Sequence, residues 1–224
     1  MAVYSIEDET GLAKELQPSV MPLAEATKVI DFPSDARGKR TLDIGAGQSA
    51  CTARLRIQGA EAYAIDPRYT DMAKLDEETS RAIEIARSRL SLHRGAAIGK
   101  RYYKLMQAAR QAFKRDYRAH NRFYINAFAG DLPFDSNSFD FVFSINCITH
   151  GLDVDDVIFR RAIQEAYRVA KVRSEIQIYP FLLKSNERIR KYHERLLQEE
   201  SLEYSVEAVP EFNSNRLRIR KHQQ

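Results

Sequence analysis

Hydrophobic and polar positions along the 224-residue chain follow two different periods. Short runs of apolar and β-branched residues predict strands, and apolar residues at spacings of three or four predict the helices between them. The predicted parallel strands, in chain order, are "RTLDI" (40–44), "AEAYAID" (60–66), "RFYINAF" (122–128), "FDFVFSINCI" (139–148) and "EIQIYPF" (175–181). Strands alternating with helices predict an α/β fold with right-handed crossovers.

The remaining stretches extend this fold. Residues 1–38 are predicted to be a helical lead-in, and 76–122 a helical insertion before the third strand, with a break at Gly95 and Gly99. The segments "YSVEAVPEF" and "RLRIRK" are predicted to pair antiparallel at the sheet edge. The whole chain, 1–224, is therefore predicted to be a single domain with a mostly parallel, seven-stranded sheet.

Composition excludes several classes of protein. No run of about 18 apolar residues is present, and the first residues lack the pattern of a secretory signal, so we expect no membrane span and a cytoplasmic location. Cys51 and Cys147 lie far apart without a CxxC spacing, so we expect neither a disulfide framework nor a metal site. The net charge of +4 is too small for a dedicated nucleic-acid coat protein.

The stretch "TLDIGAGQSA", residues 41–50, predicts a strand, a tight turn and a helix start. Gly45 and Gly47 permit positive φ angles and a close backbone approach, and the carboxyl end of a first strand is where open α/β sheets bind ligands. We interpret the turn as a cradle for a nucleotide-like cofactor. The alternative is a tight turn without a ligand, because GxG alone is a weak signal.

Asp66 ends the second strand nineteen positions after Gly47, where a carboxylate can accept hydrogen bonds from ribose hydroxyls. The alternative is an Asp–Pro turn pair. A dinucleotide fits the looser pattern GxGxxA in "GAGQSA". Three features favour S-adenosylmethionine instead. Asp43 can reach an ammonium group, and "GDLPF" can place Asp131 and Leu132 beside an adenine. The fourth strand ends in polar residues, where a substrate could meet a methyl group.

"LDIGAGQS", "AYAIDPRY", "AGDLPFDSNSFDFVFSINCITHG" and "EAYRVAK…EIQIYPF" occur in this order along the chain. Over about residues 38–180 the sequence resembles class I S-adenosylmethionine-dependent methyltransferases, in particular bacterial members with a basic helical insertion. The resemblance implies their Rossmann-like fold, methyl transfer (EC 2.1.1.-), S-adenosylmethionine as cofactor and S-adenosylhomocysteine as product. The sequence departs from the family pattern in two places. The segment "AKVRSEI" stands where many members have a Pro-Gly-Gly turn, which we interpret as a different loop. The spacing between the acid and "LPF" in "AGDLPF" is shorter than in many members, which weakens the assignment of Asp131 to the adenine.

The resemblance also implies roles for individual residues. The cofactor's methionine part is assigned to Asp43, Gly45, Ala46 and Gly47; the ribose to Asp66; the adenine to Pro67, Arg68, Asp131 and Leu132; and the sulfonium to Ser144, Ile145 and Asn146.

Methyl transfer needs mainly alignment of the acceptor with the methyl group, and a base only if the acceptor loses a proton early. His150, just after the fourth strand, is the candidate catalytic base; its alternative is a solvent-facing turn residue. We interpret Cys147 as a small buried side chain.

Residues 81–122 are strongly basic, with twelve Lys or Arg residues against Glu84 and Asp116. Such a surface can bind RNA, an anionic substrate or a partner, or it can be a solvated helix face. The leading hypothesis is a methyltransferase acting on a small molecule, with the insertion as a lid. The alternatives are an RNA or protein methyltransferase that docks through the insertion, a non-catalytic binding or scaffold protein of this fold, and a nicotinamide oxidoreductase.

Overall fold

The computed structural model describes residues 20–148, 156–181, 187–210 and 214–222. Seven strands form one sheet in the order β3-β2-β1-β4-β5-β7-β6. The strands are β1 (Arg40–Ile44), β2 (Glu61–Ile65), β3 (Tyr124–Ile125), β4 (Phe139–Ile145), β5 (Ala170–Tyr179), β6 (Glu203–Val209) and β7 (Ser214–Arg220). Only β7 runs antiparallel to its neighbours, β5 and β6. This confirms the mostly parallel, seven-stranded sheet with a terminal antiparallel pair.

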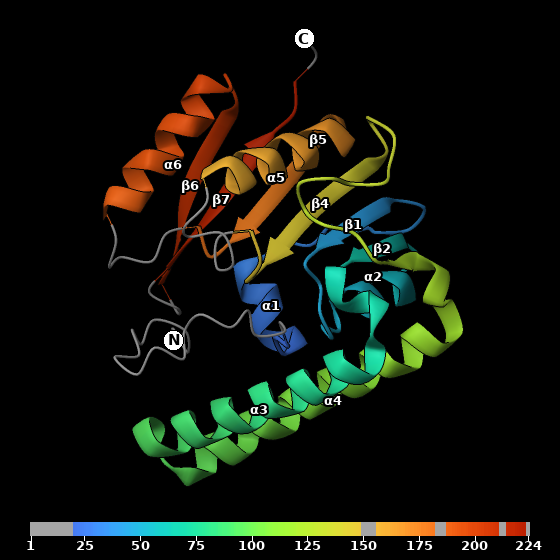
Figure 1. The fold of residues 1–224 in the computed structure, drawn as a ribbon, viewed down its shortest axis with the longest axis vertical. Helices are drawn as coiled ribbons and strands as arrows, with labels where there is room; N and C mark the ends of the chain where they lie inside the picture. Colours follow the sequence, from blue (N-terminus) through green and yellow to red (C-terminus); the bar gives the residue numbers. More distant parts are fainter. Residues whose placement is uncertain (1–19, 149–155, 182–186, 211–213, 223–224) are drawn as a thin grey trace.

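Helices cover both faces of the sheet (Figure 1). They are α1 (Leu23–Val29), α2 (Cys51–Ile57), α3 (Met72–Arg94), α4 (Ala96–His120), α5 (Asp156–Val169) and α6 (Glu187–Glu199), with short 3₁₀ turns η2 (Pro67–Thr70) and η3 (Asn121–Phe123). None of the described helices is both long enough and apolar enough to cross a membrane.

Successive side chains of β4 point to opposite faces of the sheet, and each set packs into a hydrophobic core on its own face. Val142 faces α5 and α6, where it joins a cluster that includes Phe159 and Leu196. Its neighbours Phe141 and Phe143 face α1 and α2 in a second cluster. Because both faces are covered, β4 is apolar almost throughout, as expected for a central parallel strand.

The long helical stretch predicted after β2 consists of two helices, α3 and α4, which lie side by side and project away from the sheet (Figure 1). Gly95 joins them at φ 91°. The predicted break between two helices is confirmed and lies at Gly95. Gly99 belongs to the first turn of α4, and a Cβ there would come 2.0 Å from Ser91 Oγ of α3. Its lack of a side chain therefore lets the two helices approach closely.

Two further expectations need correction. The predicted strand 122–128 shrinks to the two residues of β3, because Asn121–Phe123 form a 3₁₀ turn and the chain then leaves the sheet edge. The apolar spacing of Ile98, Ala109 and Phe113 predicts a single buried stripe along α4, but Ile98, near the joining turn, has 44% of its surface exposed. Phe113, farther along the same stripe, is buried as predicted.

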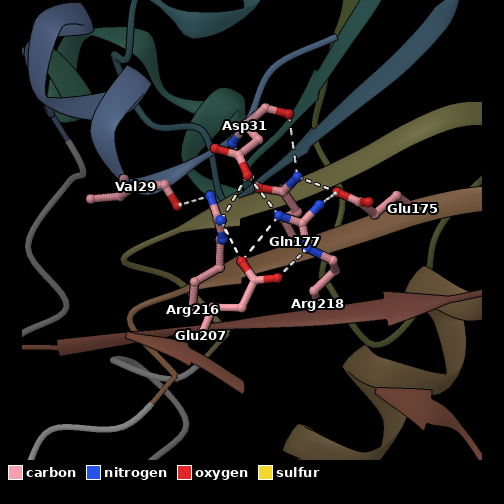
Figure 2. A network of polar contacts seen from close by, with 7 residues as sticks. All are labelled: Val29, Asp31, Glu175, Gln177, Glu207, Arg216 and Arg218. Atoms are coloured by element: carbon pink, nitrogen blue, oxygen red, sulfur yellow. Dashed lines mark hydrogen bonds and ion pairs between the residues drawn. The ribbon is translucent and has the colours of Figure 1, made fainter. Parts of the chain in front are cut away.

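A polar network fastens the segment after α1 to the antiparallel part of the sheet (Figure 2). Asp31 Oδ2 lies 2.7 Å from Arg216 and 2.6 Å from Arg218, and its backbone N–H donates to Gln177 Oε1 at 2.8 Å. Glu207 of β6 accepts from Arg218 Nε at 2.8 Å and also contacts Arg216. These contacts join residues 31, 177, 207, 216 and 218, which lie far apart in sequence.

Candidate functional site

The turn after β1 lies against the end of β2. The backbone N–H groups of Gly45 and Ala46 both donate to Ile65 O, at 2.9 and 3.0 Å. Gly45 has φ 72° and Gly47 has φ 52°, the left-handed region that favours glycine. The turn thus brings the carboxyl ends of β1 and β2 together, as the sequence predicts.

A second reason for glycine at position 45 was not foreseen. A Cβ on Gly45 would come 2.1 Å from Cys147 Sγ and 2.3 Å from Cys147 Cβ. One side of Gly45 is therefore covered by a residue that follows β4. Desolvation raises the pKa of the Cys147 thiol to about 12, so the sulfur is not an activated nucleophile.

Asp66 is fully buried at the end of β2, and hydrogen bonds fill its acceptor positions. Oδ2 accepts from Gly47 N at 3.0 Å and from Arg68 Nη2 at 2.8 Å. Oδ1 accepts from Arg68 N at 2.9 Å and from Arg68 Nε at 2.8 Å. Because a carboxylate offers about four acceptor positions, a ligand hydroxyl can bind Asp66 only if the Arg68 side chain gives way. Pro67 starts η2 directly after Asp66.

Asp43 is the second buried carboxyl group at this edge, with 2% of its surface exposed. Thr52 Oγ1 of α2 donates to its Oδ2 at 3.3 Å. Desolvation raises the pKa of Asp43 to about 8; the hydrogen bond from Thr52 opposes this shift, and the charge of Asp66 adds to it. Removal of this proton near neutral pH would be favoured by a cation placed beside the carboxyl group.

The end of β4 is held by its own polar groups. Ser144 is fully buried, and its hydroxyl donates to Ile44 O at 3.0 Å, tying β4 to β1. Ile145 is buried with the α1–α2 core. Asn146 has φ 55°, donates its backbone N–H to Tyr179 O at 2.7 Å, and keeps a half-buried side chain. Of the three, Asn146 has the side chain most accessible to a ligand.

The loop before β4 separates the two residues predicted to flank an adenine. Leu132 is 4% exposed and packs into the α5–α6 core, whereas Asp131 is exposed. The loop is fixed by α5: Leu132 N donates to Glu165 Oε2 at 2.8 Å, and Arg168 Nη2 donates to Leu132 O at 3.0 Å. Sequence analysis missed this pair, although an acid and a base three residues apart on a helix signal an ion pair.

The turn is also connected to the base of α4. Arg110 is 8% exposed, and its Nε donates to Gln48 Oε1 at 3.1 Å and to Asp76 Oδ1 at 3.0 Å. Lys114 contacts the same carboxylate at 2.7 Å. Desolvation raises the pKa of Asp76, but the hydrogen bonds from the two cations and from Gln48 together outweigh it and lower the pKa to about 2. Arg110 and Lys114 were predicted as part of the basic surface, but here they position the helix pair against Gln48, the residue after Gly47.

The structure thus brings together Asp43, Gly45, Ala46, Gly47, Asp66 and Arg68, and sets Asn146 beside the same edge through Cys147 and β4. The predicted base His150 lies outside the described residues. The site therefore consists of two buried carboxyl groups at a glycine turn. Such an arrangement suits a ligand that carries positive charge and hydroxyl groups, and disfavours an anionic pyrophosphate lying on Asp43.

Comparisons with known proteins concern one segment of the chain and its overall fold. Residues 100–176 match a family model described as a methyltransferase domain. The match includes Asp131 and residues 144–146, but not the Gly45–Gly47 turn or Asp66. A search of curated proteins gives no match.

Solved structures of low sequence identity share the fold. An S-adenosyl-L-methionine-dependent methyltransferase from Methanococcus maripaludis, itself described as putative, matches 95% of this chain and 90% of its own at 15% identity, with a TM-score of 0.55. Haemonchus contortus phosphoethanolamine N-methyltransferase 2, bound to phosphomonomethylethanolamine and S-adenosylhomocysteine, matches 92% of this chain at 16% identity and TM-score 0.55; the match spans 55% of that protein.

A third structure is a Haloferax volcanii methyltransferase, also described as putative, in complex with the activator Trm112; 89% of each chain is covered at 12% identity, with a TM-score of 0.53. The predicted fold class, the Rossmann-like fold of class I methyltransferases, is confirmed. The domain match and the fold together support a methyltransferase enzyme.

Proposed function

We propose, for a chain with the class I methyltransferase fold, that the turn at Gly45–Gly47 binds S-adenosylmethionine and that the protein transfers its methyl group to a small-molecule acceptor. The observation that carries the proposal is the pair of buried carboxyl groups, Asp43 and Asp66, at the two sides of this turn. S-adenosylmethionine bears an ammonium, a sulfonium and a ribose diol, which such a pair can hold.

The chain's own residues would divide this work as follows. Asp43 gives up its proton and faces the ammonium group, while Asp66 exchanges the Arg68 guanidinium for the ribose hydroxyls. Gly45, Ala46 and Gly47 carry no side chain larger than a methyl group, so their backbone can lie directly against the ligand. When bound, S-adenosylmethionine supplies a methyl group on a sulfonium that needs no further activation, so the protein's remaining task is alignment of the acceptor.

The adenine role of Asp131, the base role of His150 and the cytoplasmic location remain predictions, as does the bacterial origin. Asn146 supports an acceptor site at the end of β4, because its side chain is half-buried at the edge where Asp43 and Asp66 meet. Leu132 and Ser144 support the site indirectly, since their described contacts hold the loop and the strand in place.

A macromolecular acceptor, RNA or protein, is the second candidate, and it is favoured by the basic face of α4. An experiment with methyl-labelled S-adenosylmethionine separates the two. The purified protein is incubated with a metabolite fraction, an RNA fraction and a protein fraction in parallel, with Asp66→Ala as the control. Label in the metabolite fraction that is lost with Asp66→Ala supports the proposal. Label only in RNA or protein contradicts the small-molecule acceptor.

A further inference from the structure

The two long helices, α3 and α4, carry different mixtures of charged side chains on their exposed surfaces. On α3 the exposed cations alternate with acids: Arg81 lies 3.0 Å from Glu77, and Arg87 lies 2.7 Å from Glu84. On α4 none of the described exposed residues is acidic. Its acid, Asp116, is turned inward, with 11% of its side chain exposed, and pairs with Arg56.

The exposed Lys and Arg residues of α4 form a single row, which we call the α4 row. They follow one another along the helix with most separations of three, four or eleven residues, which return to the same side. The members of the row are Lys100, Arg101, Lys104, Arg115 and Arg118. At 1.5 Å per residue the row is about 27 Å long. Ala108 and Gln111 fill its middle and are also exposed.

The α4 row has no partner within the described part of the chain. None of its five cations forms an ion pair with a described acidic side chain. Like charges at these spacings repel by about 0.2–0.5 kcal/mol per pair, so the row destabilises α4. A solvated helix face would be expected to mix both signs, as α3 does. The row therefore points to an external polyanion.

We infer that the α4 row binds the phosphate backbone of a nucleic-acid strand. The row runs along one side of a single helix, which fits a single line of phosphates. It contains no large apolar side chain of the kind that inserts into a lipid surface. The aromatic residues of α4 pack toward the core and away from the row: Phe113 is 1% exposed, Tyr117 packs against it, and Tyr102 and Tyr103 pack against the buried cluster between α3 and α4. Binding is therefore insensitive to base sequence.

The row is structurally connected to the proposed cofactor turn. Arg110 and Lys114, which lie on the inward side of α4 between Lys104 and Arg115, hold Asp76, and Arg110 also reaches Gln48 next to Gly47. A strand bound along α4 would thus lie on a helix fixed to the turn. The inference concerns the second candidate function, a macromolecular acceptor. It rests on the proposed function only in taking the Gly45–Gly47 turn as the cofactor site.

The test is anisotropy of a labelled polyuridine RNA of about 20 nucleotides, titrated between about 50 and 200 mM salt. Five phosphate contacts predict a slope of about −3.5 in log affinity against log salt, or about a 100-fold loss over this range. Arg115→Gln with Arg118→Gln leaves three contacts, a slope of about −2 and about a 20-fold loss. The matched control, Arg81→Gln with Arg87→Gln, removes the same net charge and leaves the slope unchanged.

Three outcomes overturn the inference: no RNA binding at low salt, an equal loss in both double variants, or binding to phosphatidylserine vesicles in place of RNA. The RNA titration contains no S-adenosylmethionine, and cofactor binding is measured separately on the same variants by calorimetry. A failure of RNA binding with intact cofactor binding would refute the α4 row alone. The reverse result would refute the proposed function alone.

Discussion

Asp43 makes the proposed cofactor affinity dependent on pH. Burial raises the pKa of this carboxyl group to about 8, so at pH 6 it is protonated before binding. An ammonium group binds the carboxylate, which means that one proton must leave when the cofactor binds. Each pH unit below the pKa then weakens binding about tenfold, or 1.36 kcal/mol. Between pH 6 and about 7.5 we expect the affinity for S-adenosylmethionine to rise about 20-fold, because the increase flattens as the pH approaches the pKa.

Calorimetry measures this linkage in two ways. Titrations across this pH range give the affinity, and titrations in buffers of different ionisation enthalpy give the protons released, expected to approach one at pH 6.5. The cofactor's α-amino group, with an ordinary pKa of about 8, loses its proton on about one-quarter of the molecules by pH 7.5, which slightly reduces the expected rise. Asp43→Asn is the control and should bind weakly, with no rise in affinity as the pH increases. A flat wild-type profile, or the same slope in Asp43→Asn, would refute the reasoning.

Three further predictions concern neighbouring contacts. Arg68→Met should strengthen S-adenosylmethionine binding, on the order of tenfold by calorimetry, because Asp66 loses its competing partner; weaker binding would mean that Arg68 contacts the ligand. Arg216→Met breaks the network of Figure 2 and should lower the free energy of unfolding by about 2–4 kcal/mol, seen as a fall in Tm of about 5–15 °C. The control Arg87→Gln, which removes an exposed ion pair, should change the free energy of unfolding by less than about 1 kcal/mol. Gly45→Ala should lower the urea midpoint, and Cys147→Gly in the same chain should restore part of it; no rescue would contradict the predicted clash.

Local patterns in the sequence were enough to predict the sheet. The runs that became β1, β2, β4 and β5 are short and apolar, and the glycines at 45 and 47 mark the turn in which both residues have positive φ. The two long helices followed from their apolar spacing. Local detail was less predictable: Gly99 resembles part of the helix break, yet it lies in the first turn of α4, where the absence of a side chain lets Ser91 of α3 approach.

The contacts of the site were less predictable, because they join residues distant in sequence. Nothing in "IDPRY" shows that Arg68 folds back onto both oxygens of Asp66. Likewise, Arg110 looked like one more cation of a basic surface, and only the packing of α4 against α3 carries it to Gln48 and Asp76. Periodicity identifies which residues are buried, but it does not identify the side chains they meet.

The most direct measurement is calorimetric titration of the purified protein with S-adenosylmethionine and S-adenosylhomocysteine, with Asp66→Ala and NADH as controls. We predict micromolar binding of both sulfur ligands, loss of that binding in Asp66→Ala, and no heat with NADH. No heat with either sulfur ligand would contradict the central claim that the turn after β1 binds the methyl donor.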